Sequence, residues 1–240
     1  MRLNPIFLKD EITSARRFTL PVLVTLVNGS LSVLVISNLF FISKSARITG
    51  EISYVNFLRI YYLAAAAEVL LILLITPALT ATSVSGERDR KTLGLLLTTQ
   101  LDPWDIVIGK LMGALSTLLL LVLTSMPILA TVYIYGGITW YQLSMFFFFL
   151  VTSAVFCSSI GIMVSSFFTT TAAATAVAYV MIFVSYTVML MAAIFRVQLG
   201  IPENRIVPGI FISIWIMSLF LLYISKRHIT PHRRRKLREG

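Results

Sequence analysis

Apolar residues occur along this chain in six long runs, separated by shorter polar segments. Each run holds roughly 17–30 residues, enough for a helix to cross a hydrocarbon core of about 30 Å with some tilt. The pattern therefore predicts an all-α membrane protein with six transmembrane helices. We expect these helices at residues 18–42, 58–82, 106–135, 140–167, 172–195 and 209–225.

A polar segment of mixed charge precedes the first run. Asn4 and Pro5 suit the N-cap and the first turn of a helix. We interpret residues 4–17 as an amphipathic helix on the membrane surface, within a cytoplasmic segment 1–17. A plain juxtamembrane anchor without a partner would explain the same residues.

The longest polar interruption lies between the second and third runs, at residues 83–105. It carries five consecutive charged residues, namely Glu87, Arg88, Asp89, Arg90 and Lys91. We expect a soluble partner to bind here, because the rest of the chain is either membrane span or short flank. The domain organisation is thus one transmembrane domain over residues 18–225, followed by a basic tail at 226–240.

Composition supports a membrane protein and explains the basic charge. Of the 240 residues, 58% are hydrophobic and 12% are charged, and the mean hydropathy is +0.90. Soluble domains have about 45–50% apolar residues. The net charge is +10, but seven of the 20 Lys and Arg residues lie in the tail. This placement favours contact with anionic lipid headgroups over nucleic acid.

The distribution of Lys and Arg predicts the orientation. Six spans put both termini on one side of the membrane, together with the loop 83–105. Fifteen of the 20 basic residues lie on that side when Lys110, at the start of the third span, is counted with the loop. Because basic residues accumulate in cytoplasmic segments, we expect both termini and this loop to be cytoplasmic, in a multi-pass protein of the cell membrane.

Glu68 is the one charged residue deep within a predicted span. It lies about ten residues into the second span, roughly 15 Å along the helix and so near the midplane. A carboxyl group at that depth is costly, so it faces the bundle interior or water, or carries a proton. Two hypotheses remain open: a gating or pathway residue, and a hydrogen-bonded strut between helices.

Other candidate features indicate packing more than chemistry. Gly109 and Gly113 form a GxxxG pattern that favours close helix packing or a dimer face. His228 and His232 are four residues apart but flank Pro231 in the basic region, so we predict no metal site there. The sequence contains no zinc-protease, phosphate-loop or nucleophile-elbow motif, so we expect no catalytic residue and no cofactor bound by this chain.

The loop 83–105 resembles the cytoplasmic loop of ABC-2 type transporter permeases. That family has an acidic-Arg-acidic cluster, then Thr-Leu, a leucine run, and Gly-Lys opening the next span. The matching positions here are Glu87-Arg88-Asp89, Thr92-Leu93, Leu95-Leu96-Leu97 and Gly109-Lys110. The family often has Thr-Pro after the leucine run, whereas this chain has Thr98-Thr99-Gln100.

The resemblance implies a non-catalytic permease subunit of an ATP-binding cassette exporter. Two permease protomers, identical or related, would pair with two separate ATP-binding subunits that hold ATP and Mg. The loop would form a coupling helix seated in a groove of the ATPase. The coupling residues would be Glu87, Arg88, Asp89, Arg90, Lys91, Thr92, Leu93 and Leu96. Their charges suit directional salt bridges and their leucines an apolar anchor.

Residues 111–195 contain no Asp, Glu, Lys, Arg or His. A pathway through these spans would suit a hydrophobic or amphipathic substrate. Two other function classes stay open. One is an ion-coupled secondary transporter that uses Glu68. The other is a membrane anchor for an ATPase that moves no cargo.

Overall fold

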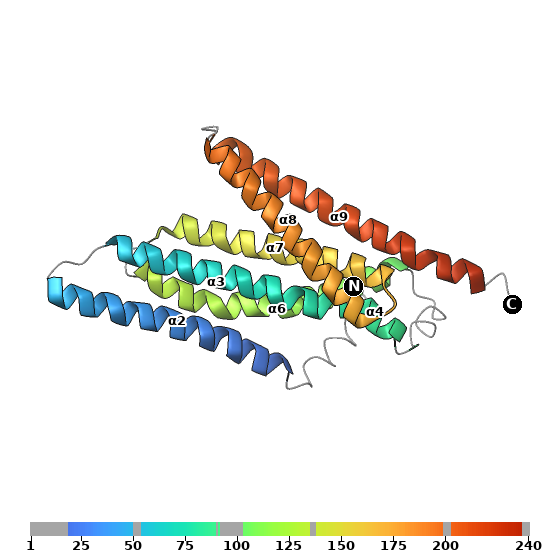
Figure 1. Cartoon of the computed structure of the whole chain (residues 1–240), viewed down its shortest axis with the longest axis horizontal. Coiled ribbons are helices and arrows are strands. Elements are labelled where there is room, and N and C mark those ends of the chain that lie inside the picture. Colours follow the sequence, from blue (N-terminus) through green and yellow to red (C-terminus); the bar gives the residue numbers. More distant parts are fainter. Residues whose placement is uncertain are drawn as a thin grey trace, which may run out of the picture. The chain divides into compact units, whose positions relative to one another are not determined.

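The computed structural model describes residues 19–49, 54–89, 91, 103–134, 138–198 and 203–236 (Figure 1). Within these residues the chain forms helices and no strand. The helices are α2 (Thr19–Thr49), α3 (Tyr54–Thr80), α4 (Thr82–Asp89), α6 (Pro103–Ile134), α7 (Trp140–Phe167), α8 (Thr171–Gln198) and α9 (Glu203–Lys236). The predicted helix 4–17 lies outside the described residues.

Six of these helices are long and apolar enough to cross a membrane, which confirms the predicted all-α fold with six spans. The spanning segments are Thr19–Ser45, Phe57–Asp89, Trp104–Thr131, Trp140–Phe167, Thr171–Phe195 and Gly209–His228. Several helices extend beyond the predicted apolar runs. α2 continues to Thr49, and α9 begins at Glu203 and ends at Lys236. Hydropathy locates the apolar segment, whereas backbone hydrogen bonding carries a helix on into polar sequence.

The chain divides into two compact units. Unit 1 comprises Met1–Glu11, Leu73–Leu115 and Thr152–Gly240, and unit 2 comprises Ile12–Ile72 and Ser116–Val151. Three helices, α3, α6 and α7, contribute residues to both units.

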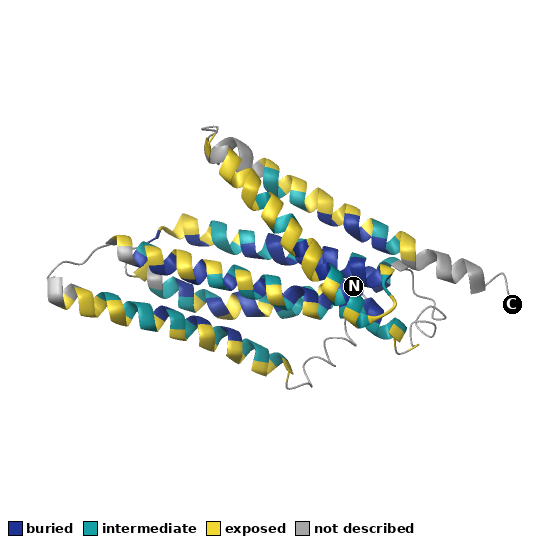
Figure 2. Cartoon of the chain, in the orientation of Figure 1, coloured by how far each residue is buried: buried dark blue, intermediate teal, exposed yellow. Residues whose placement is uncertain are grey.

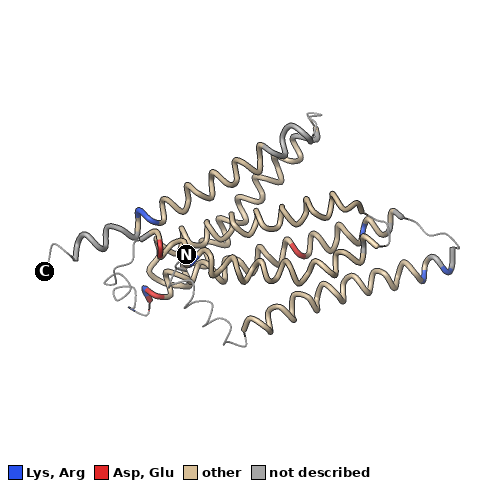
Figure 3. Tube along the Cα trace, turned by 180° about the vertical axis from the view of Figure 1, so that it is seen from behind, with Lys and Arg blue, Asp and Glu red and all other residues tan. Residues whose placement is uncertain are grey.

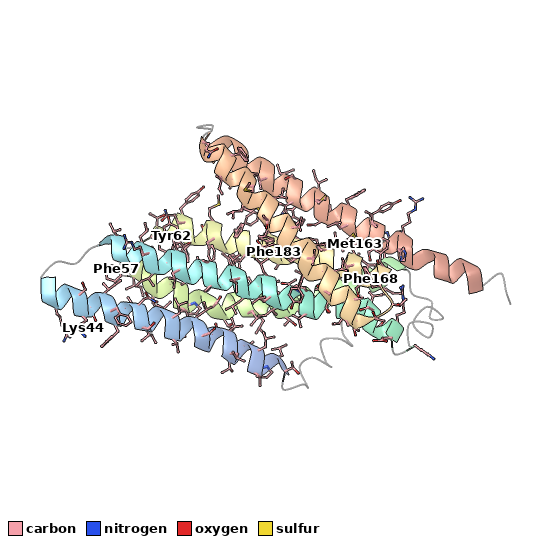
Figure 4. All side chains as sticks on the ribbon, viewed as in Figure 1. Lys44, Phe57, Tyr62, Met163, Phe168 and Phe183 are labelled. Carbon is pink, nitrogen blue, oxygen red and sulfur yellow. The ribbon has the colours of Figure 1, made fainter. Side chains whose placement is uncertain are left out.

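Unit 2 packs α2 beside the first part of α3 and the second part of α6 (Figure 1). Its larger core joins Val35 of α2, Tyr61 of α3 and Leu129 of α6, with Leu143 of α7. Side chains on one helix separate into two faces: near the start of α3, Phe57 is buried while Tyr62 is 58% exposed (Figure 4). Tyr62 thus lies on an apolar outer face, as expected for a helix that meets lipid tails.

Unit 1 packs the second part of α7 against α8 and α9. Its core includes Cys157 and Val164 of α7, Ala178 of α8 and Leu221 of α9. Along α8 and α9 exposed positions predominate (Figure 2). Phe183 of α8, for example, is 73% exposed (Figure 4). These two helices therefore present a largely apolar surface outside the unit's core.

One close helix contact in unit 1 depends on a glycine. A Cβ atom placed on Gly161 of α7 would lie 2.8 Å from the Cβ of Thr80 at the end of α3, closer than real Cβ contacts. The neighbouring Ser158 and Ser159 are fully buried. Small residues here let α7 approach the end of α3, as they do in other membrane helix pairs.

Candidate functional site

The polar contacts around α4 form the most connected group of charged side chains that the structure describes. α4 follows α3 after a single turn residue, Ala81, and ends at Asp89. We call the group the α4 junction; it consists of Val84, Ser85, Glu87, Arg88, Asp89, Lys110, Ser165, Ser166, Phe168, Thr171 and His228, all in unit 1.

The beginning of α4 is capped by a residue of another helix. The backbone N–H groups of Val84 and Ser85 donate to the Oγ of Ser165, at 2.9 and 2.8 Å. N–H groups in the first turn of a helix have no partner within that helix. All three residues are fully buried. Ser165 of α7 therefore provides, from about 80 positions away in sequence, the acceptor that an N-cap side chain usually provides.

Arg88 of α4 in turn hydrogen-bonds to backbone carbonyl groups at the end of α7. Its Nη2 donates to the carbonyl of Ser166 at 3.1 Å, and its Nη1 lies 3.4 Å from the carbonyl of Phe168. The last carbonyls of a helix lack partners and carry partial negative charge. A guanidinium supplies both the hydrogen-bond donors and the positive charge that these carbonyls favour, and it uses two donors of its planar group. Phe168 lies at the turn into α8 (Figure 4).

Glu87 joins α4 to the start of α6. Its Oε1 lies 2.7 Å from the Nζ of Lys110, and the two side chains are 19% and 9% exposed. An ion pair this shielded is screened far less than one at an open surface. Asp89, at the end of α4, accepts a hydrogen bond of 3.3 Å from Thr171 in the first turn of α8. Together these contacts tie α4 to α6, α7 and α8.

α9 contacts the same end of α7. The Nδ1 of His228 lies 3.0 Å from the carbonyl of Ser166, the oxygen to which Arg88 also donates. The ring of His228 lies 4.2 Å from that of Phe167. Two residues before, the Nζ of Lys226 lies 4.7 Å from the centre of the Trp104 ring, a cation–π contact to the first turn of α6.

Lys91 ends this segment with an unusual backbone. Its φ is 58°, in the left-handed region, and its N–H donates to the carbonyl of Arg88 at 3.0 Å. This conformation commonly follows the end of a helix, where glycine is preferred. Lys91 and Asp89 are exposed.

The structure thus separates the predicted coupling residues into two groups. Glu87 and Arg88 are at least partly buried and contact other helices of the chain, whereas Asp89 and Lys91 have exposed side chains, although Asp89 also accepts a hydrogen bond from Thr171 of α8. The other four predicted coupling residues, Arg90, Thr92, Leu93 and Leu96, lie outside the described residues. The role of the whole set stays a prediction.

Glu68 belongs to unit 2 and is 2% exposed. Its Oε1 contacts the hydroxyl of Ser125 on α6, and its Oε2 is buried without a hydrogen-bond partner. Long uncharged stretches separate the charged positions along the described helices (Figure 3). The placement in the bundle interior agrees with either hypothesis for Glu68, pathway or strut. For the packing pair on α6, Gly109 is buried and Gly113 is half-buried.

Sequence reasoning missed the residues that hold α4 in place. Ser165 and Ser166 are uncharged residues at the end of an apolar run, so no motif distinguishes them. The sequence presents His228 only as a possible metal ligand, because its contact with Ser166 depends on how α9 packs. Among the described residues no group of three or more His, Cys, Asp or Glu side chains could hold a metal ion.

Six helices that are long and apolar enough to span a membrane indicate a multi-pass membrane protein. The chain belongs to the ABC-2 family of transporter proteins, whose family model matches residues 9–228. It is therefore a permease subunit of an ABC transporter, and membership implies pairing with an ABC ATP-binding subunit. A comparison with curated proteins finds no match.

Proposed function

We propose that a separate ATP-binding subunit docks on the loop 83–105 and drives export of a hydrophobic or amphipathic substrate. In this proposal the loop and both termini are cytoplasmic, and two permease protomers bind two ATP-binding subunits. ATP and Mg bind only to those subunits, and this chain is non-catalytic. The observation that carries the proposal is that α4 is joined to α6, α7 and α8 by Glu87, Arg88 and Asp89.

These contacts suit the transmission of force from a docked partner. A displacement of α4 would separate Glu87 from Lys110 and Arg88 from the carbonyls of Ser166 and Phe168, unless α6 and the end of α7 moved with it. Depriving a shielded charge of its partner costs about 3–5 kcal/mol. Moving the helices together keeps the pair intact and so requires less free energy than separating them. Motion imposed on α4 would therefore reach several spans at once.

The exposed residues Asp89 and Lys91 are the described groups best suited to contact the partner. They lie at the end of α4, and their side chains are open to a second protein. Opposite charges so close together favour a partner surface that also carries both signs, which fixes orientation more than it adds affinity.

The docking test uses co-expression of the chain with candidate ATP-binding subunits, beginning with one encoded by an adjacent gene. We expect a complex with ATPase activity to copurify. The double variant Asp89→Lys/Lys91→Glu reverses both exposed charges and should weaken copurification at least tenfold. A control variant, Lys44→Glu/Arg47→Glu, reverses two exposed charges at the end of α2 and should leave the complex intact. Failure to copurify with any ATP-binding subunit would overturn the docking proposal.

The coupling test asks whether ATP hydrolysis moves substrate. Vesicles that hold the complex should accumulate an amphipathic dye when ATP is supplied on the ATPase side. Arg88→Ala should retain the complex and its ATPase activity while ATP-driven uptake falls. A complex that hydrolyses ATP but transports nothing would instead favour the anchor hypothesis. Uptake driven by an ion gradient without ATP would favour the secondary transporter.

A further inference from the structure

The contacts of the buried pair Glu68 and Ser125 raise the question of which group supplies the hydrogen for each hydrogen bond. The Oγ of Ser125 contacts Oε1 of Glu68 and also lies 2.9 Å from the carbonyl of Val122 on its own helix. A serine hydroxyl has one hydrogen to donate, and a carbonyl oxygen or an ionised carboxylate can only accept. Each of the two contacts has a hydrogen of its own only if Glu68 supplies one; otherwise the serine hydrogen is shared between two acceptors.

The surroundings of Glu68 also disfavour a charge. Ile72, Val122 and Leu150, from α3, α6 and α7, form the apolar cluster of this part of unit 2. Ser125 itself is fully buried, and the second carboxyl oxygen of Glu68 has no hydrogen-bond partner. An ionised carboxylate that is buried without a counter-ion is far less stable than the neutral acid.

No cation in the described part of unit 2 compensates Glu68. The ionisable side chains described there are Lys44 and Arg47 on α2, Arg59, Tyr61 and Tyr62 on α3, Tyr133 on α6 and Tyr141 on α7. The phenol of Tyr61 interacts electrostatically with Glu68. Arg59 precedes Glu68 by nine residues, which is about 13 Å along a helix. Ordinary tyrosines are neutral at pH 7.

We propose that Glu68 and Ser125 form a proton-binding site within the transmembrane domain. In this site a neutral Glu68 donates from Oε1 to the Oγ of Ser125, and Ser125 donates to the carbonyl of Val122. The ligand is a proton, and it completes a hydrogen-bonded bridge between α3 and α6. The bridge does not depend on how an ATP-binding subunit docks, so it stands apart from the proposed function.

Infrared difference spectroscopy on the full-length protein in lipid nanodiscs tests the site. A protonated carboxyl has a C=O stretching band that a carboxylate lacks. At neutral pH the wild-type minus Glu68→Gln spectrum should contain this band. Ser125→Ala should shift the band to higher frequency, because the carboxyl loses its acceptor. The matched control, Ser144→Ala, removes an exposed serine of α7 that bonds only its own helix at 2.9 Å, and should leave the band unchanged.

The opposite results are equally clear. A carboxylate band instead of a carboxyl band in the wild-type minus Glu68→Gln spectrum at neutral pH would overturn the proposal. Should Glu68→Gln fail to fold, the Ser125→Ala difference spectrum alone decides the question. A shift confined to the carboxylate bands would mean that Ser125 hydrogen-bonds an ionised Glu68. No shift in the carboxyl band would mean that Ser125 does not accept a hydrogen bond from Glu68. Either result would overturn the proposal.

Discussion

The α4 junction in unit 1 and the Glu68–Ser125 pair in unit 2 satisfy polar groups in different ways. At the junction, Glu87 pairs with Lys110, and Arg88 donates to the carbonyls of Ser166 and Phe168. Glu68 has one hydroxyl contact, and its second carboxyl oxygen is buried without a hydrogen-bond partner. The junction thus stabilises charged side chains with partners, whereas the proposed proton site keeps its carboxyl group neutral.

The difference follows from the backbone groups that are available at each site. Helix ends expose unpaired N–H and carbonyl groups, which are ready partners for serine and arginine side chains. The middle of a membrane helix has its backbone groups already paired, so a carboxyl there must find a side chain or hold a proton. Substitutions that change charge should therefore affect the two sites unequally.

The largest effect is expected from Lys110→Glu. This change places a second carboxylate beside Glu87 in a shielded site, and should lower the free energy of unfolding by about 3–5 kcal/mol. Reversible unfolding in mixed detergent micelles measures the loss. The charge swap Glu87→Lys/Lys110→Glu re-forms an ion pair and should recover much of it. An equally unstable double variant would show that the pair itself contributes little.

Glu68→Lys should come next and contrast with Glu68→Gln. A lysine near the centre of a membrane helix costs about 2.5–3.5 kcal/mol. Gln has the shape of the neutral acid and retains a donor for Ser125, so its stability should stay close to wild type. The same unfolding titration compares the two variants. A large loss for Glu68→Gln would contradict a neutral Glu68 and reduce the contrast between the two regions.

Arg88→Lys tests whether the shape of the cation matters at the end of α7. Lysine keeps the charge but cannot reach the Ser166 and Phe168 carbonyls with a rigid fork. Loss of one hydrogen bond from a charged donor should cost about 1.5–3 kcal/mol. Hydrogen exchange at the last turn of α7 should rise with it. Unchanged exchange would mean that charge alone stabilises this helix end.

Ser165→Ala isolates the cap on α4. The N–H groups of Val84 and Ser85 would lose their shared acceptor, and loss of a capping side chain typically costs about 1 kcal/mol. We expect faster hydrogen exchange of these two amides, while Ser159→Ala, whose hydroxyl bonds only within α7, should leave them unchanged. Equal effects from both variants would indicate a general loosening of α7.

Lys91→Gly should have the smallest effect and the opposite sign. A left-handed backbone costs a non-glycine residue about 1–2 kcal/mol, and the entropy of glycine in the unfolded chain offsets part of this gain. We therefore expect a slight increase in stability. If binding of the ATP-binding subunit weakens while stability rises, the exposed amine of Lys91 contributes to docking.

The sequence predicted the elements but not their contacts. The six apolar runs give the six spans because membrane thickness sets the length of an apolar helix. The charged cluster begins in the last turns of α4, and the depth of Glu68 in its apolar run distinguishes it from the other charged residues. The bonds of Arg88 to residues 166 and 168, and of Glu68 to Ser125, connect distant positions that carry no shared motif.

By itself, then, the sequence determined a six-span helical permease with a charged segment between the second and third spans. These features follow from hydropathy, charge distribution and a family pattern, all of which are local in the chain. Only the tertiary structure decided which charges are used internally and which remain exposed. The physical reason is that pairing depends on which helix ends and faces meet in space. Ser125 and Ser165 belong to no sequence motif, and their hydrogen-bonding roles follow only from that packing.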